Sequence, residues 1–138
     1  MKKILVDTWA WSAMTNRRDT EHELAKTTNK RLADAGYHYV TTNFILDETY
    51  TLIRMKLHHR GAVEFGHMIK QIKAAEEITV VQITAELEEA AWEIFERYDD
   101  KDFSFTDCTS FQVMILMSIT EAFTDDHHFE QFGFVIYP

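Results

Sequence analysis

Acidic residues that could bind a metal ion are spread along the whole chain. The C-terminal stretch FTDDHHFEQFGFVIYP holds two carboxylates, Asp125 and Asp126, beside two histidines, His127 and His128. By itself this stretch is either part of a working site or a polar turn between two strands. The answer depends on which other acids the fold brings beside it. The other candidate acids are Asp7, Glu48 and Asp107.

Carboxylates gathered at one site have a recognisable chemistry. They repel one another, so their pKa values rise unless a cation lies between them. All-oxygen ligands suit Mg²⁺ or Mn²⁺, which are hard ions that keep several bound waters. Such an ion activates water and stabilises the charge that develops on a phosphate. A cluster of these acids would therefore indicate metal-assisted chemistry at a phosphate group.

The first two acids also have structural explanations. Asp7 directly follows the apolar run ILV, where it is either a site residue at a strand end or a turn and N-cap residue. Glu48 shares an apolar helical stripe with Phe44, Leu52 and Met55. We therefore expect its carboxylate to face inward or into a cleft, because an unpaired buried charge is costly. The alternative for Glu48 is a buried ion pair with a lysine or arginine.

The later acids sit at predicted element ends. Ser104 and Asp107 have the spacing of a capping box, which places Asp107 in the first turn of a helix and is compatible with a metal-binding role. The paired aspartates follow the strand candidate at 121–124. If that strand neighbours the first one, an acid of the pair and Asp7 share one edge of the sheet, where ligand sites of parallel sheets lie.

The hydrophobic pattern predicts strands that alternate with helices. The run KKILVD is apolar without alternation, which is typical of a strand buried on both faces. We predict an α/β protein with a largely parallel sheet. The further strand candidates are 37–42, 78–83, 121–124 and 134–137. The predicted helices are TWAWSAM, 20–35, 43–58, 62–75, 85–98 and 105–119, the last apolar on nearly all faces and so expected to be central.

Length and composition favour a single domain that covers residues 1–138. The only cysteine, Cys108, excludes an internal disulfide, and no segment reads as a signal peptide or a membrane span. We therefore expect a cytoplasmic protein that is not membrane-bound. The net charge of −9 hides a basic first half and a strongly acidic second half. The first half could bind phosphates while the acids elsewhere hold cations.

Four segments carry a family resemblance, namely ILVDTWAWSA, TTNFILDETYTLI, FTDCTSF and FTDDHHFEQFGF. Together they resemble PIN-domain proteins and are similar to the VapC-type toxin ribonucleases. The resemblance implies a three-layer α/β/α fold whose sheet has four or five strands in the order 3-2-1-4-5. It assigns the catalytic and metal-binding acids to Asp7, Glu48, Asp107 and Asp126. Asp125 then takes a variable position, and His128 has no ligand role.

The same resemblance implies an activity and partners. It implies a Mg²⁺-dependent endoribonuclease, with Mn²⁺ as a possible replacement, that acts on RNA as the toxin of a toxin–antitoxin pair. It also implies a cognate antitoxin and a homodimer. The basic run RMKLHHR (54–60), with Arg17 and Arg18, is either the surface that follows the RNA phosphates or an ordinary solvated helix end. Trp9 and Trp11 replace small residues usual in the family, and they either pack in the core or narrow the cleft.

Other aspartate-based α/β classes fit poorly. A haloacid-dehalogenase-type phosphatase needs a second aspartate two residues after the first, and this chain has Trp9 there. A response-regulator receiver needs an acceptor aspartate at the end of its third strand, where this chain offers only Gln82. A non-catalytic PIN-like domain that binds RNA or protein without cutting remains the alternative function.

Overall fold

The fold is built on one parallel sheet. The computed structural model describes all 138 residues. Its five strands lie in the order β3-β2-β1-β4-β5, and every neighbouring pair is parallel. This confirms the predicted α/β class and strand order. The strands are β1 (Lys3–Val6), β2 (His38–Thr42), β3 (Ile78–Val81), β4 (Glu121–Phe123) and β5 (Val135–Tyr137).

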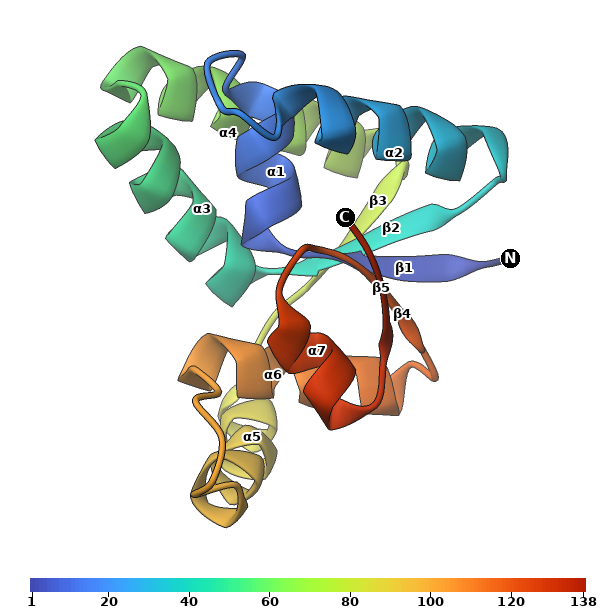
Figure 1. Cartoon of the computed structure of the whole chain (residues 1–138), viewed down its shortest axis with the longest axis vertical. Coiled ribbons are helices and arrows are strands. Elements are labelled where there is room, and N and C mark those ends of the chain that lie inside the picture. Colours follow the sequence, from blue (N-terminus) through green and yellow to red (C-terminus); the bar gives the residue numbers. More distant parts are fainter.

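Seven helices form two layers around this sheet (Figure 1). The chain first steps outward from β1 to β3 and then returns to the other side of β1. Because crossovers between parallel strands are right-handed, the two series of helices cover opposite faces. One layer holds α1 (Thr8–Thr15), α2 (His22–Asp34), α3 (Asn43–Lys56) and α4 (His59–Ala74). The other holds α5 (Ala85–Arg97), α6 (Phe105–Leu116) and α7 (His127–Phe132).

Trp11 anchors the first layer to the sheet. Its side chain is buried, and its ring meets the rings of Tyr39 and Phe65 edge-on. Its indole N–H donates a 3.3 Å hydrogen bond to the hydroxyl of Thr41. Trp11 is therefore a core residue and does not narrow a cleft. Trp9 is half-buried and packs edge-on against Phe123.

Two elements differ from the sequence prediction. The helix α7 was not expected, because six residues are too few for a periodic pattern to show. It is held by the buried ring of Phe129 and ends at Gly133, whose φ of 113° is left-handed. The helix predicted to be central, α6, is buried only over its first part, since Ile115 and Leu116 are 51% and 63% exposed.

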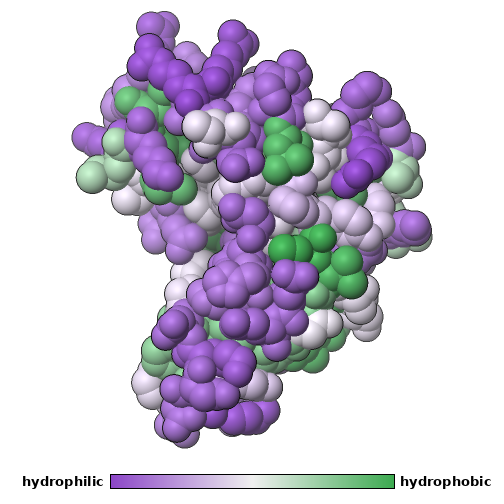
Figure 2. Space-filling model, in the orientation of Figure 1, coloured by the Kyte–Doolittle hydropathy of each residue, from purple (hydrophilic) through white to green (hydrophobic).

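The surface is mostly polar on the face that Figure 2 shows, where apolar side chains gather only in small separate patches. None of the helices has the length and apolar character that crossing a bilayer requires. Side chains from both helical layers join those of the sheet in one hydrophobic core of 26 buried residues. This core fixes the carboxyl ends of the central strands, where the candidate acids lie.

Candidate active site

The candidate site lies where β1 and β4 end side by side. Residue Asp7 comes directly after β1, and its backbone N–H donates a 3.2 Å hydrogen bond to the carbonyl of Phe123 in β4. The hydroxyl of Thr124 donates a 3.0 Å hydrogen bond to Asp7 Oδ2. In this sheet the chain leaves β1 in one direction and β4 in the other, so this is the switch point where parallel sheets place ligands.

The carboxyl group of Asp7 is almost completely buried, with 7% of the residue exposed. Its pKa is raised from 3.8 to about 7, mainly by burial and also by the nearby carboxylates of Asp107 and Glu48, while hydrogen bonds from the backbone of Thr8 and the hydroxyl of Thr124 oppose the shift. A carboxyl group with this pKa is about half protonated at pH 7, and a positive charge close to it would favour the ionised form. Asp7 also occupies the N-cap position of α1, but its side chain makes no capping hydrogen bond there.

Asp107 is held in the first turn of α6 by a complete capping box. The N–H of Ser104 donates to Asp107 Oδ2 at 3.0 Å, and the N–H of Asp107 donates to the Ser104 hydroxyl at 2.9 Å. The carboxyl group is nevertheless buried, and burial raises its pKa, with a further contribution from Asp126. The cap therefore fixes the position of Asp107 without neutralising the charge.

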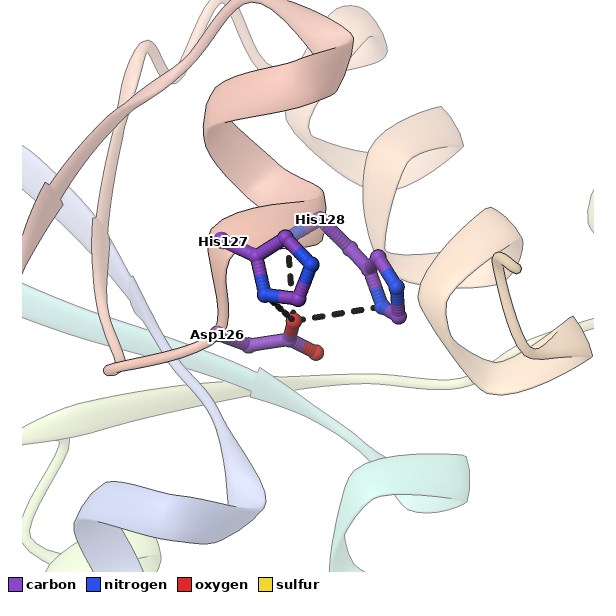
Figure 3. A group of neighbouring side chains, drawn as sticks. All are labelled: Asp126, His127 and His128. Carbon is purple, nitrogen blue, oxygen red and sulfur yellow. Dashed lines mark hydrogen bonds and ion pairs between the residues drawn. The ribbon is translucent and has the colours of Figure 1, made fainter. Parts of the chain in front are cut away.

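Asp126 and His128 lie side by side (Figure 3), and the carboxylate of Asp107 lies next to the ring of His128. Asp126 caps α7 by accepting a 2.9 Å hydrogen bond from the backbone N–H of His128. The Nδ1 atom of His128 lies 3.2 Å from Asp126 Oδ1 and 3.3 Å from Asp107 Oδ2. These distances are short enough for ion pairs, but neither contact has the geometry of a hydrogen bond, so the buried Nδ1 has no hydrogen-bond partner. His127 is exposed, although its ring also approaches Asp126.

Glu48 lies on the solvent-exposed side of the candidate site. Of the two positions expected for Glu48, facing inward or into a cleft, the first does not apply, because Glu48 is exposed and Met55 is 78% exposed. The stripe instead lines a groove of about 390 Å³ between α3 and the start of α6, where Thr106 faces it. The expected cleft is therefore present, and the buried ion pair is not, since no lysine or arginine pairs with Glu48.

Asp125 differs from its neighbour Asp126. It is exposed and makes no side-chain hydrogen bond, whereas Asp126 is only partly exposed and caps α7. Partial burial raises the pKa of Asp125, and the charge of Asp126 adds to this, followed by those of Glu21 and Asp19. Asp125 therefore interacts with acids of the segment before α2 as well as with the site.

The comparison with known proteins identifies the family. A PIN domain matches residues 4–135 of this chain. The chain belongs to the PIN-domain family. A curated relative, the 23S rRNA-specific endonuclease VapC20 of Mycobacterium tuberculosis, known from two strains, is 38% identical over 132 residues, which cover 96% of this chain and 95% of the relative.

Two solved structures have the same architecture as this chain. The crystal structure of M. tuberculosis VapC20, described as a Sarcin-Ricin loop cleaving toxin, superposes with a TM-score of 0.82 at 38% identity and covers 96% of both chains. A chain of VapBC2 from Rickettsia felis, solved with a DNA fragment from its promoter, gives a TM-score of 0.70 at 9% identity. It covers 97% of this chain and 96% of that one, and at this identity it supports the fold alone.

The donor atoms of this PIN domain fit a hard divalent cation. No lysine or arginine forms an ion pair with any of the four candidate acids, and the only basic side chains in contact with them are His127 and His128, beside Asp126 and Asp107. The unpartnered Nδ1 of His128 faces two carboxylate oxygens, and a positive charge among these three atoms would satisfy all of them. Carboxylate oxygens are the ligands that Mg²⁺ and Mn²⁺ prefer.

Sequence reasoning overlooked two residues of this PIN domain. Thr124 binds Asp7, and it is an unremarkable strand-end threonine in the sequence. A polar residue that ends a buried strand directly before two acids was the available signal. His128 was expected to be a neighbour without a ligand role, but its ring nitrogen lies between Asp107 and Asp126. One possible ligand atom from each of Asp126, His127 and His128 lies within 4.8 Å of the other two. A metal site with both oxygen and nitrogen ligands is therefore geometrically possible.

Proposed function

We propose that this PIN domain is a metal-dependent endoribonuclease and the toxin of a toxin–antitoxin pair. The observation that carries the proposal is the uncompensated acid cluster at the switch point, in which buried Asp7 has a pKa of about 7 and interacts with Asp107 and Glu48. The identity of 38% to an endonuclease over nearly the whole of both chains supports the same activity.

Each acid has a distinct part in this proposal. In this proposal Asp7, Glu48, Asp107 and Asp126 would hold Mg²⁺ or Mn²⁺, which when bound would supply an activated water and neutralise charge on the phosphate. Thr124 orients Asp7 through its hydroxyl, and Ser104 fixes Asp107 through the capping box. Glu48 stands at the open groove, where substrate enters, while the other acids lie deeper.

The proposed substrate is ribosomal RNA. One relative is named for action on 23S rRNA, and the similar solved structure is described as cleaving the sarcin–ricin loop. A ribosomal substrate would place the protein in the cytoplasm. The proposed partners are a cognate antitoxin and a second copy of the chain, since exposed Trp92 and Phe95 on α5 are the kind of surface that a partner covers. We also propose that residues 1–138 form a single domain, which the one hydrophobic core supports.

The test is cleavage of purified 23S rRNA and of a synthetic sarcin–ricin hairpin. We expect cleavage with Mg²⁺ or Mn²⁺, none with EDTA, and a loss of at least about 100-fold in the Asp7→Asn variant, because the ion loses a charged ligand. Binding of either RNA without cleavage under all metal conditions would instead favour the non-catalytic alternative.

A melting experiment checks the metal independently of activity. Millimolar Mn²⁺ should raise the melting temperature relative to EDTA, since the folded protein gathers the acids that the unfolded chain separates. Mn²⁺ should raise the melting temperature of the Asp7→Asn variant by less than that of the wild type. Equal melting temperatures with Mn²⁺ and with EDTA would argue against a metal site at these acids.

A further inference from the structure

Two cavities meet on the outer face of α3. The first is the groove beside the candidate acid Glu48. The second has a volume of about 310 Å³ and lies where α3 meets the start of α4. Thr51 lines both cavities, so they adjoin each other at this residue of α3. The first is lined by Asp47, Glu48, Thr51, Leu52, Met55 and Thr106. The second is lined by Tyr50, Thr51, Arg54, His59, Ala62 and Val63.

The two adjoining cavities differ in the charge of their lining side chains. The first cavity carries two carboxylates and no basic side chain. The second carries Arg54 and His59 and no acid. It is also lined by the first turn of α4, which contains no acidic residue. Because the N-terminal end of a helix carries a partial positive charge, this turn adds to the attraction for an anion. The second cavity is therefore a cationic corner next to the acidic groove.

We propose that this corner binds a phosphate of the RNA substrate that neighbours the scissile one, through Arg54 and His59. The proposal rests on the ribonuclease function proposed above. Arg54 follows Glu48 by six residues, which is about 9 Å along the helix axis, so the two sites are separate but within reach of one strand. A nucleic acid strand carries an anionic phosphate at every step, which matches a cation placed beside a metal-dependent cleavage site.

The basic residues of the run 54–60, identified in the sequence as a possible RNA-binding surface, have different surroundings in the structure. Arg54 and His59 line the corner, and Arg54 has no acidic partner. Arg60 pairs with Glu64 at 3.4 Å and does not line the corner. His58 uses Nδ1 to accept a hydrogen bond from Gly61, and it lines a separate cavity together with Arg17 and Arg18. Only part of the run therefore lines the cavity that adjoins the groove beside Glu48.

Binding of RNA to a cleavage-deficient protein tests the assignment. In the Asp107→Asn background, the affinity for a fluorescent sarcin–ricin hairpin is measured at several salt concentrations. We expect Arg54→Ala to weaken binding by about fivefold or more and to reduce the slope of log K against log salt by roughly 0.7 to 1, the change for one lost phosphate contact. Arg54→Lys should restore most of the affinity, because a point charge is enough for a phosphate.

The matched control is Arg97→Ala. Arg97 is also an exposed arginine in the last turn of a helix, but it lies on α5 in the opposite layer. The Arg97→Ala substitution should change the RNA affinity and the salt slope only through its small effect on net charge. Thermal melts of all variants check folding, and because Arg54 is exposed, its replacement should leave the melting temperature close to that of the wild type.

Three results would overturn the inference. If Arg54→Ala and Arg97→Ala have equal effects while the wild type still cleaves RNA, Arg54 is a solvated helix end and the proposed function stands. If Arg54→Ala leaves RNA binding unchanged but weakens binding of polyglutamate, the corner recognises acidic protein. If the Asp107→Asn protein does not bind RNA and the wild type does not cleave it, the proposed function and the inference both fail.

Discussion

The hydroxyl of Thr124 donates a 3.0 Å hydrogen bond to the carboxylate of Asp7, although 117 positions separate the two residues. The same hydroxyl oxygen accepts a 3.1 Å hydrogen bond from the backbone N–H of Asp126. One side chain at the end of β4 therefore ties together the acid that follows β1 and the acid that begins α7. Residues joined in this way keep their relative positions, which a metal site built from distant segments requires.

Replacing Thr124 by valine should weaken metal binding without unfolding the protein. The hydrogen bond from Thr124 lowers the pKa of Asp7 in the wild type. Valine keeps the shape of threonine but cannot make this hydrogen bond, so the pKa of Asp7 should rise further in the variant. We expect about tenfold weaker Mn²⁺ binding at pH 7 by calorimetry, in the range seen for residues that orient metal ligands. The loss should shrink at higher pH. Thr124→Ser keeps a hydroxyl and should bind almost as the wild type does. Equal losses in both variants would contradict this role.

The charge on Asp7 should make the metal-free protein less stable as the pH rises. Its pKa is about 7 in the folded protein, against 3.8 for an unperturbed aspartate, so the folded state binds this proton more tightly. The resulting stabilisation is complete below about pH 4 and is lost as the pH rises through about 7. Asp7→Asn resembles the protonated form. In EDTA, the variant should match the wild type at pH 4 and exceed its unfolding free energy at pH 8 by up to about 4 kcal/mol. Denaturant titrations at both pH values would show this, and a constant difference would contradict it.

Substitution of Asp107 separates its two roles. Asparagine keeps an oxygen that can accept the N–H of Ser104, so the capping box should largely persist. It also removes a buried charge beside Asp126, and the metal-free stability should therefore hold or rise. RNA cleavage should fall by at least about 100-fold. As a cap alone, Asp107→Asn would cost up to ~1 kcal/mol and leave cleavage intact. A less stable variant with unchanged RNA cleavage would show that Asp107 acts only as a helix cap.

The paired aspartates before α7 should respond differently. Asp126 contacts His128 beside Asp107, whereas Asp125 is exposed and lacks hydrogen bonds from its side chain. We expect Asp126→Asn to reduce cleavage at least about tenfold more than Asp125→Asn does, since only Asp126 lies among the site acids. Both variants change the net charge equally, so each is the control for the other. A greater loss from Asp125→Asn would reverse the assignment.

The sequence alone was sufficient for the candidate acids and for the order of the elements, except for the short helix α7. Strands such as β1 are continuous apolar runs, and the helices show their own periodicity, because both patterns depend on neighbouring residues. The capping box of Ser104 and Asp107 is local for the same reason. The strand order and the PIN family came from motifs at element ends and are confirmed. The roles of the four acids stay predictions.

Only the tertiary structure decided how each acid is surrounded. The apolar stripe that contains Glu48 lines an open groove between α3 and the start of α6. Asp7 is buried beside the end of β4, and this burial is the main cause of its pKa of about 7, whereas the hydrogen bond from Thr124 lowers that pKa. Burial and pKa depend on atoms brought close by folding, whatever their distance in sequence. Local patterns contain no record of those contacts, and the position of His128 between Asp107 and Asp126 could not be read from them.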